Sequence, residues 1–505
     1  MQRRSLVLVT VDCLRADRLA FEGYSRPLMP FLNKLAADSV VFSHAVVAGA
    51  PTYFSFPAIM ASRFPLGLGR EVLGIAPGEP TIATALREAG YESAAFVAGN
   101  PYLTSRFGYD QGFEHFSDFL DAGPPTATNV NVPVNGRFAR LNHWLERLSS
   151  YTKLTAATYD EMYFRYCQWR SSREYLSLDQ LRRYPAADVV VDAACAWLKE
   201  RVDQPFFLWI HLMDPHHPYY PPEEALQSLG ISHIDSRRAR FLNSFWNRGD
   251  VSAARLQRYK REVMALYDAG VHWVDQQLLR LVDFLKVHQL WVDTVFVVTG
   301  DHGEEFLEHG NRYHSPIALT EQLIHVPLLI RGLTPTRVVP GPFSLIHLAP
   351  TLLESLGVNV PSSFKGRALW KDFSQGKQVD LPSIVECVES CNNQLSVSDR
   401  KGNRLMAVLE SDYKLVLRFR EENDHLYDLK NDPEEMYPLP HSAQAKDRAR
   451  LLQYARQHLR HTREDRDGML ELRSRFREIH QRFGLKSAPV EASEDRKIAE
   501  IGEHG

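Results

Sequence analysis

The chain has few cysteines, no long apolar run and no excess of charge of one sign. Its five cysteines among 505 residues are odd in number and scattered, which argues against a disulfide framework and favours a reduced, cytoplasmic protein. The formal net charge of −3 gives no reason to expect a nucleic-acid partner. No segment has the roughly 20 apolar residues that a bilayer crossing needs, so we expect no membrane span.

Three apolar, β-branched-rich runs each end beside polar residues that can bind ligands: Ser5–Val11, Phe206–Ile210 and Thr294–Thr299. Near-continuous apolar runs of this length are typical of parallel strands buried on both faces. Between residues 256 and 285, apolar residues recur at helical spacing. Alternating strands and helices predict a doubly wound α/β sheet with one ligand-binding edge. The polar residues after the runs are Asp12, His211, Asp214, His216, Asp301 and His302.

The remaining patterns divide the chain into further parts. A Pro/Gly/Asn-rich stretch followed by aromatic- and Arg-rich segments predicts a helical insertion at about 121–184. Short strand-like runs at Leu405–Leu409 and Tyr413–Phe419 predict a small C-terminal α+β subdomain. Beyond residue 441 the pattern is charged and helical, typical of a helix that packs on a domain with one apolar face. The expected parts are a main domain at 1–375, a small-sheet subdomain at 376–440 and a tail at 441–505.

An Asp and a His stand side by side at the end of the third apolar run, as Asp301 and His302. Together they offer an oxygen and an imidazole nitrogen to one divalent cation. Alternatively, Asp301 caps a helix that starts near Glu304. The same two interpretations apply to Asp12, which ends the first run. A shared sheet edge would bring the three residues together and favours metal binding.

A hydroxyl-bearing stretch at residues 50–57 contains Thr52 and Ser55. A Thr or Ser hydroxyl is a poor nucleophile near neutral pH, but coordination to a metal lowers its pKa. Taken alone, Thr52 would be interpreted as a loop hydroxyl without a catalytic role. A cation held by the Asp and His residues described above could activate it and neutralise an ester's non-bridging oxygens.

Histidines concentrate after two of the apolar runs, within residues 211–219 and 308–314. Imidazolium groups can bind a tetrahedral anion, and one can protonate a leaving oxygen. Any one of them alone would be interpreted as structural, but their concentration near the predicted strand ends favours a site. They are His211, His216, His217, His309 and His314.

These motifs, in this order, resemble the sulfatase family of the alkaline phosphatase superfamily. The resemblance covers most of residues 5–120 and 185–440. It includes the segments at 10–17, 62–65, 96–103, 214–216 and 301–305. It implies an α/β/α sandwich of alkaline phosphatase/sulfatase type, with residues 1–375 as the catalytic domain, followed by the small C-terminal α+β subdomain.

The resemblance also implies the residues of a site around one divalent ion, Ca²⁺, Mg²⁺ or Mn²⁺. The expected metal ligands are Asp12, Asp301, His302 and the nucleophile Thr52. The expected catalytic residues are Thr52, His216 and His314, with the two histidines facing the substrate anion. The expected substrate-binding residues are His211, Asn100, Arg15, His309 and Ser55.

The chain departs from the family at the nucleophile. Sulfatases place Cys or Ser in a Cys/Ser-x-Pro-x-Arg pattern, and that residue is oxidised to formylglycine. Counting back thirteen residues from Pro65 gives Thr52, whose β-methyl group excludes formylglycine; threonine there looks like the superfamily's phosphodiesterases and phosphoethanolamine transferases. A rival register places Ser55-Phe56-Pro57 on the pattern but puts Ile59 where Arg belongs. Cys13 stands where the family often has a second Asp.

The leading hypothesis is a metal-dependent hydrolase of small-molecule sulfate or phosphate esters that uses a metal-activated hydroxyl nucleophile. One alternative is a phosphodiesterase or phospho-group transferase of the same superfamily. Another is a catalytically inactive member that binds an anion or a partner. The sequence leaves open the choice between sulfate and phosphate, and whether the chain forms a homo-oligomer.

Overall fold

The first strand, β1 (Ser5–Val11), lies in the middle of the central sheet and is buried at every position. Its side chains alternate between two apolar cores: Leu6 and Leu8 pack into one, and Val7 and Val9 into the other. Since successive residues of a strand point to opposite faces, a strand covered on both faces needs an apolar residue at each position. This is why the run lacks the polar alternation of a half-exposed strand.

The central sheet is mixed, with eight strands among the described residues. Strands β5 and β6 flank β1 in parallel, whereas β9 runs antiparallel to β6 and β2. The α/β class is thus confirmed, and the three apolar runs expected as parallel strands are parallel, while β9 makes the sheet mixed. Across the sheet the order is β10 (Arg337–Ser344), β2 (Ser39–Val46), β9 (His325–Arg331), β6 (Thr294–Gly300), β1, β5 (Phe206–Leu212), β3 (Glu92–Val97) and β4 (His115–Ser117).

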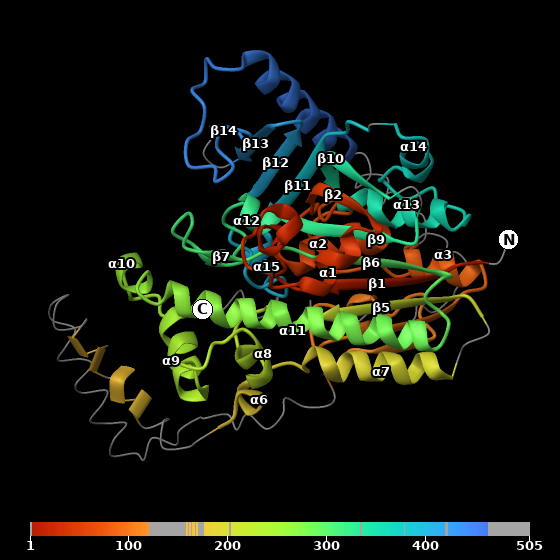
Figure 1. The fold of residues 1–505 in the computed structure, drawn as a ribbon. Helices are drawn as coiled ribbons and strands as arrows, with labels where there is room; N and C mark the ends of the chain where they lie inside the picture. The colour runs from red at the N-terminus through yellow and green to blue at the C-terminus, as the bar shows by residue number, and fades with distance from the viewer. Residues whose placement is uncertain are drawn as a thin grey trace, which may run out of the picture.

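Helices cover both faces of this sheet and give the α/β/α layers (Figure 1). Apolar residues of three helices join the core on one face, and those of three others join the core on the opposite face. The helical pattern predicted across residues 256–285 is interrupted, because α10 (Ala253–Leu256) ends before the long helix begins. On one face lie α1 (Pro30–Ala36), α7 (Ala187–Lys199) and α11 (Lys260–Val287), and on the other α2 (Thr52–Ala61), α3 (Ile82–Glu88) and α13 (Leu348–Ser355).

A second, four-stranded antiparallel sheet follows the main body and forms the lobe at the top of Figure 1. The predicted strand-like runs lie in it, and a helix at 445–462 packs on it through Leu451 and Ala455. The small C-terminal subdomain is therefore confirmed as a sheet, while its limits at 376–440 stay a prediction. Its strands are β11 (Ser383–Val388), β12 (Arg404–Glu410), β13 (Tyr413–Arg418) and β14 (Asn423–Asp428).

A buried lysine joins the small sheet to the main body. Lys414, on β13, has a fully buried side chain and lies 2.9 Å from Glu321 Oε1 and 2.7 Å from Glu435 Oε1. Glu321 begins α12 (Glu321–Ile324), directly before β9. Because a buried ammonium needs carboxylate partners, this triad fixes β13 against the end of the central sheet.

The small sheet also contacts the loop that leads into α2. The Glu386 amide donates to the Ala48 carbonyl over 2.9 Å, and the Tyr53 hydroxyl donates to the Cys391 carbonyl. Both contacts lie within four residues of Thr52, so the C-terminal sheet helps to place the start of α2.

The computed structural model describes residues 3–120, most of 158–169, 176–200, 204–333, 336–377, 379–419 and 423–462. Most of the predicted insertion and the tail beyond 462 lie outside these residues. Within them, no helix has the length and apolar character needed to cross a membrane. The remaining elements are η1 (Ala16–Arg18), η2 (Ala20–Glu22), η3 (Ser105–Phe107), η4 (Leu345–His347), α6 (Leu178–Leu181), α8 (Glu223–Ser228), α9 (Ser236–Trp246), α14 (Trp370–Ser374), α15 (Val397–Arg400), β7 (Glu305–Phe306) and β8 (Arg312–Tyr313).

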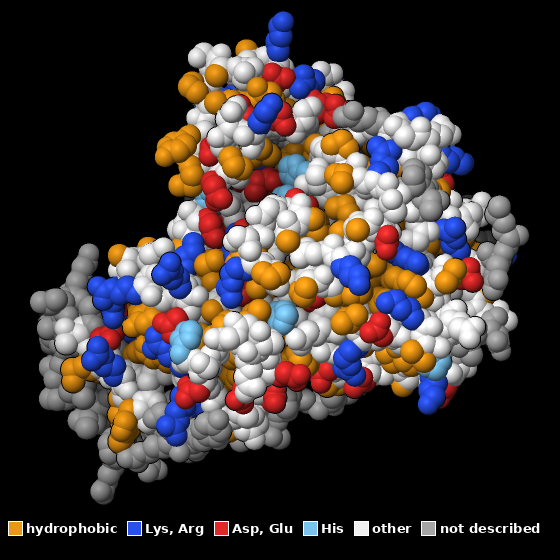
Figure 2. All heavy atoms as spheres, in the orientation of Figure 1, with side chains coloured by type: hydrophobic (Ala, Val, Ile, Leu, Met, Phe, Trp, Pro, Cys, Tyr) orange, Lys and Arg blue, Asp and Glu red, His pale blue; other side chains and the backbone are white. Residues whose placement is uncertain are grey.

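Lys/Arg and Asp/Glu side chains are interspersed over the face drawn in Figure 2. This mixture agrees with the near-balance of 59 basic and 62 acidic residues. It does not test the expectation that nucleic acid is no partner, which stays a prediction.

Candidate metal centre and active site

The ends of β1 and β6 place two carboxylates side by side. Val11 and Gly300 are paired in the parallel ladder, so the next residues, Asp12 and Asp301, leave the sheet together. The Cys13 amide donates to Asp301 Oδ1 over 3.3 Å, and both Asp side chains are fully buried. A helix does not begin at Glu304, since β7 follows there, so Asp301 is not the helix cap that the sequence left open.

His302 and Thr52 complete a cluster of four donor groups with the two carboxylates. The Thr52 hydroxyl, at the first residue of α2, lies 3.1 Å from His302 Nε2 and 3.4 Å from Asp12 Oδ2. His302 Nε2 lies 3.6 Å from Asp12 Oδ1 and 3.7 Å from Asp301 Oδ2. His302 Nδ1 donates to the Gly303 carbonyl over 2.9 Å, which leaves the Nε2 lone pair facing the cluster. Atoms around one divalent ion have comparable separations, about 3–3.5 Å.

The chemistry of this cluster fits a divalent cation. Carboxylate, hydroxyl and imidazole donors suit Mg²⁺, Mn²⁺ or Ca²⁺, and Oδ2 of Asp301 is buried without a hydrogen-bond partner. Burial, and then the charge of Asp12, raise the pKa of Asp301 well above its usual range. Burial opposes ionisation of Asp12 too, but the charge of His216 and a hydrogen bond from His211 lower its pKa well below the usual range. A cation would supply the counter-charge that two buried carboxylates need.

Two residues expected to bind substrate contact Asp12, and their binding to a substrate stays a prediction. Asn100 Nδ2 donates to Asp12 Oδ2 over 3.1 Å, and His211 Nε2 lies 3.4 Å from the same oxygen. His211 Nδ1 lies 3.0 Å from the Thr10 hydroxyl, which also accepts from Trp209 Nε1 over 3.0 Å. Hydrogen bonds of this kind fix the orientation of metal-binding side chains. Asn100 and His211 therefore position Asp12.

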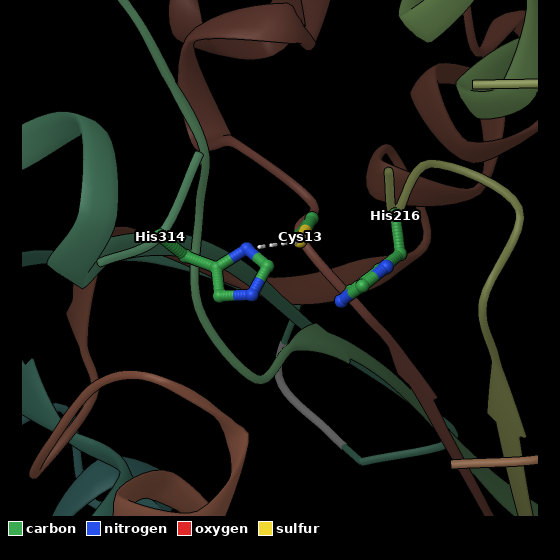
Figure 3. Close-up of side chains that lie close together, drawn as sticks. All are labelled: Cys13, His216 and His314. Carbon is green, nitrogen blue, oxygen red and sulfur yellow. Dashed lines mark hydrogen bonds between the residues drawn. The ribbon is translucent and has the colours of Figure 1, made fainter. Parts of the chain in front are cut away.

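His216 and His314 approach Cys13 from opposite sides, as Figure 3 shows. His314 Nδ1 lies 3.4 Å from Cys13 Sγ, and the two imidazole rings have centroids 4.8 Å apart. His216 Nδ1 lies 2.8 Å from the Tyr184 hydroxyl, which donates to the His217 carbonyl. The predicted pair of histidines thus faces the same space as the cluster around Thr52, since the His302 and His314 rings also have centroids 4.7 Å apart.

The buried carboxylate of Glu304 adjoins this histidine pair. Its Oε1 lies 3.1 Å from His314 Nδ1. Burial raises the pKa of Glu304 to about 7, although the charges of His216 and His302 act in the opposite direction. Burial, and then the charges of His302 and His216, lower the pKa of His314 well below its usual range. His314 is therefore neutral near pH 7.

The Arg15 guanidinium is held in an ion-pair network. It lies 2.7 Å from Asp17 Oδ2 and 2.9 Å from Glu308 Oε1, and it donates to the Glu304 carbonyl over 2.8 Å. These partners accept hydrogen bonds from the N–H groups of the guanidinium. Arg15 thus contacts the segment from Glu304 to Glu308, and its binding to a substrate stays a prediction.

Ser55 and His309 are not brought into contact with the cluster within the described parts of the chain. Ser55 lies one turn after Thr52 on α2, and its buried hydroxyl has no hydrogen-bond partner. His309 is half-buried, and its Nε2 is likewise without a partner. Of the two candidate hydroxyls, Thr52 is therefore the one that faces the metal-ligand groups.

Sequence reasoning missed Cys13, Glu304 and Tyr184 as members of the site. Cys13 directly follows Asp12, and Glu304 lies in the Asp-His-Gly-Glu motif, so both could have been found from their position. Tyr184 stands at the end of the poorly patterned insertion, and nothing in the sequence indicates its contact with His216.

An α/β/α sandwich with a hydroxyl, two carboxylates and imidazoles converging at its strand ends defines an ester hydrolase of the alkaline phosphatase superfamily. The Sulfatase family model matches residues 4–358, and the chain belongs to the sulfatase family. It is a hydrolase of sulfuric or phosphoric esters.

Two relatives illustrate the range within this class. The chain is 23% identical to the multifunctional alkaline phosphatase superfamily protein PehA of Trinickia caryophylli, over 86% of this chain and 91% of that protein. It is 26% identical to arylsulfatase K of Xenopus laevis, over 49% of this chain and 51% of that protein. The chain thus spans about half the length of arylsulfatase K and most of PehA.

Solved structures share the fold at lower identity. The phosphonate monoester hydrolase of Agrobacterium radiobacter superposes with a TM-score of 0.63 and 18% identity, over 92% of this chain and 96% of that one. The phosphonate monoester hydrolase from Silicibacter pomeroyi gives a TM-score of 0.64 and 18% identity over the same shares. The predicted sandwich is thereby confirmed.

Proposed function

We propose that the chain is a metal-dependent hydrolase of phosphorus esters, of the phosphodiester or phosphonate monoester type, with Thr52 as nucleophile. The observation that carries the proposal is the position of the Thr52 hydroxyl, 3.1 Å from His302 Nε2 and 3.4 Å from Asp12 Oδ2. A divalent ion bound among these groups would lower the pKa of the hydroxyl and draw negative charge from the ester.

The reaction then proceeds as two successive displacements at phosphorus. Thr52 Oγ attacks phosphorus, the bond to the leaving oxygen breaks, and a threonyl ester remains. Water then attacks the same phosphorus and restores the hydroxyl. The start of α2 favours this position for Thr52, because the first turn of a helix presents free amide groups to an anion. His216 and His314 face the same space and act on the leaving oxygen, while Asn100 and His211 hold Asp12.

The choice of phosphorus rests on the chemistry of threonine. Formylglycine releases sulfate when its hydrate collapses to the aldehyde, which breaks a carbon–oxygen bond, and the Thr52 side chain cannot form that aldehyde. A threonyl ester must instead be cleaved by attack on its phosphorus or sulfur atom. Similarity to two phosphonate monoester hydrolases and to a multifunctional relative supports the proposal.

A sulfate ester is the second candidate substrate. Family membership and similarity to arylsulfatase K favour it. A phospho-group transferase or an inactive anion-binding member would differ in a direct assay, the first by needing an acceptor other than water and the second by showing no turnover.

The test is a panel of aryl esters combined with identification of the nucleophile. We expect bis-aryl phosphodiester or aryl phosphonate to be hydrolysed faster than aryl sulfate with Mg²⁺, Mn²⁺ or Ca²⁺. Thr52→Ala should abolish turnover, whereas Ser55→Ala, one turn along the same helix, should retain it. Mass spectrometry after acid quenching should find the adduct on Thr52. Full activity of Thr52→Ala, or an aldehyde on Ser55, would show that the nucleophile is misassigned.

The reducing, cytoplasmic location stays part of the proposal. The described cysteines Cys13, Cys195, Cys387 and Cys391 are all free thiols. Assaying activity with and without a thiol reductant tests whether reduced cysteines are required.

A further inference from the structure

We infer that Cys13, His216 and His314 form a second metal site, selective for a thiophilic cation such as Zn²⁺, beside the Asp12–Asp301–His302 cluster. The inference deepens the proposed function and rests on it for the role of the ion, which is to stabilise the leaving oxygen. It replaces proton donation by the two histidines, because an imidazole nitrogen that binds a cation has no proton to give.

Cys13 Sγ and His314 Nδ1 are separated by the distance expected of two ligands of one tetrahedral ion, and His216 lies beside them. Cys13 Sγ and ring nitrogens of His216 and His314 all lie within 4.8 Å of one another. Zinc binds sulfur at about 2.3 Å and nitrogen at about 2.0 Å, which places two tetrahedral neighbours about 3.5 Å apart. The observed 3.4 Å between Cys13 Sγ and His314 Nδ1 matches that edge.

The lone pair of His216 is free on the side that faces Cys13. His216 Nδ1 donates to the Tyr184 hydroxyl over 2.8 Å, and Tyr184 in turn donates to the His217 carbonyl. Nε2 is then left unprotonated, and Figure 3 shows the outer ring nitrogen of His216 directed toward Cys13. A metal-binding imidazole ordinarily has its other nitrogen bonded in this way.

Glu304 provides an independent indication of a cation. Its side chain is fully buried, its Oε1 lies 3.1 Å from His314 Nδ1, and its Oε2 has no hydrogen-bond partner. A buried carboxylate oxygen without a donor is costly unless a positive charge stands next to it. Glu304, beside His314, is the carboxylate that would supply a fourth, oxygen donor to the ion.

The two sites are adjacent because their ligands are neighbours in the chain. The Cys13 thiol donates to Asp12 Oδ1 over 3.1 Å. A cation that binds the sulfur would displace this proton to solvent, and it would face the same substrate space as a cation on the carboxylates. Two adjacent cations can stabilise the attacking and the leaving oxygen of one displacement. The thiolate gives the second site a preference for Zn²⁺ over Mg²⁺ or Ca²⁺.

The experiment counts bound zinc without using turnover. The reduced, full-length protein is stripped with a chelator and titrated with zinc alone, and the metal content is measured after gel filtration. We expect two zinc ions per chain, one in Cys13→Ser, and two in the control Cys195→Ser, whose thiol lies on α7. His314→Gln repeats the test at a side chain that is 16% exposed and should likewise bind one.

Cobalt substitution identifies the ligand. Co²⁺ should give a thiolate-to-cobalt charge-transfer absorption in the wild type, in Cys195→Ser and in Asp301→Asn, and none in Cys13→Ser. Tyr184→Phe should weaken the second ion roughly tenfold or more by releasing His216. One zinc ion in the wild type, or a charge-transfer band in Cys13→Ser, would overturn the inference.

Hydrolysis measured on the same samples separates the two proposals. Two bound ions without turnover would contradict the proposed function and leave the second site standing. Turnover by a wild type with one ion would contradict only the second site.

Discussion

At the scale of single residues, the metal-ligand segment depends on one close backbone approach. A Cβ added to Gly303 would lie 1.9 Å from the Gln322 carbonyl oxygen and 3.3 Å from Arg15 Cγ. Only glycine fits at this position, directly after Asp301 and His302. Packing therefore requires a glycine next to the two metal-ligand residues.

We predict that Gly303→Ala destabilises the fold by about 1–3 kcal/mol or more through this overlap and weakens metal binding as the ligand pair shifts. Urea unfolding and metal titration measure the two effects. Gly249→Ala is the matched control, because a Cβ at Gly249 meets nothing within 4 Å, and its effect should stay within about 0.5 kcal/mol. Equal stability of the two variants would contradict the prediction.

The sequence predicts the residues of the site best where they directly follow a strand. Asp12 and Asp301 are found from their apolar runs, and Thr52 from the spacing of its loop to Pro65. Tyr184 could not be predicted, because its contact depends on how the end of an irregular segment packs. Arg15 has a motif position that suggests substrate binding, and its ion pair with Glu308 could not be predicted because only folding brings that residue near.

At the scale of elements, the junction of β13 and α12 depends on the buried Lys414. We predict that Lys414→Met costs about 3–5 kcal/mol, because Glu321 and Glu435 would remain buried without their shared cation. Lys377→Met removes an ion pair with Asp372 in which the lysine side chain is 59% exposed. This change should cost at most about 1 kcal/mol. Chemical denaturation compares the two, and similar losses would show that the triad contributes little.

The junction of β11 with the C-terminal helix should depend on pH through Glu386. Burial opposes ionisation of this carboxyl, but the charge and hydrogen bond of His458 and the charge of Arg404 lower its pKa below the usual range. A lowered pKa in the folded state stabilises the protein above the unfolded pKa of about 4.3, and this stabilisation is lost as pH falls below that value.

We therefore predict that the free energy of unfolding falls more steeply in the wild type than in Glu386→Gln as pH falls from about 5 to about 3. Denaturant titrations across that range measure the slopes. Glu71→Gln is the control, because that side chain is 74% exposed, and it should keep the wild-type slope. Parallel curves for the wild type and Glu386→Gln would contradict the assignment.

Element positions were predictable to within one or two residues where both faces are buried. The runs at Ser5–Val11 and Thr294–Thr299 correspond to β1 and β6, because a continuous apolar run has few other stable structures. The direction of β9 was not predictable, since a strand buried on both faces has the same pattern whichever way it runs. The break between α10 and α11 was missed because apolar spacing continues across it.

At the scale of the whole molecule, the site concentrates buried negative charge. Asp12, Asp301 and Glu304 are all fully buried within one space. We predict that chelation lowers the melting temperature, since an ion at a hundred times its dissociation constant stabilises the folded state by about 2.7 kcal/mol. Calorimetry with and without metal measures the shift, and Asp301→Asn should reduce it. An unchanged melting temperature would contradict metal binding.

Because β1 lies between β6 and β5 in the sheet, it cannot pair until later parts of the chain have been synthesised. Leu6 pairs with Phe207 on one side and with Val295 on the other, so β1 is synthesised before both strands with which it pairs. At about 5–20 residues per second, that wait is roughly ten seconds to a minute. Through this interval an apolar segment has no partner strands, and we expect it to be prone to aggregation. We expect a message truncated before residue 294 to yield an aggregating product that also lacks Asp301 and Glu304.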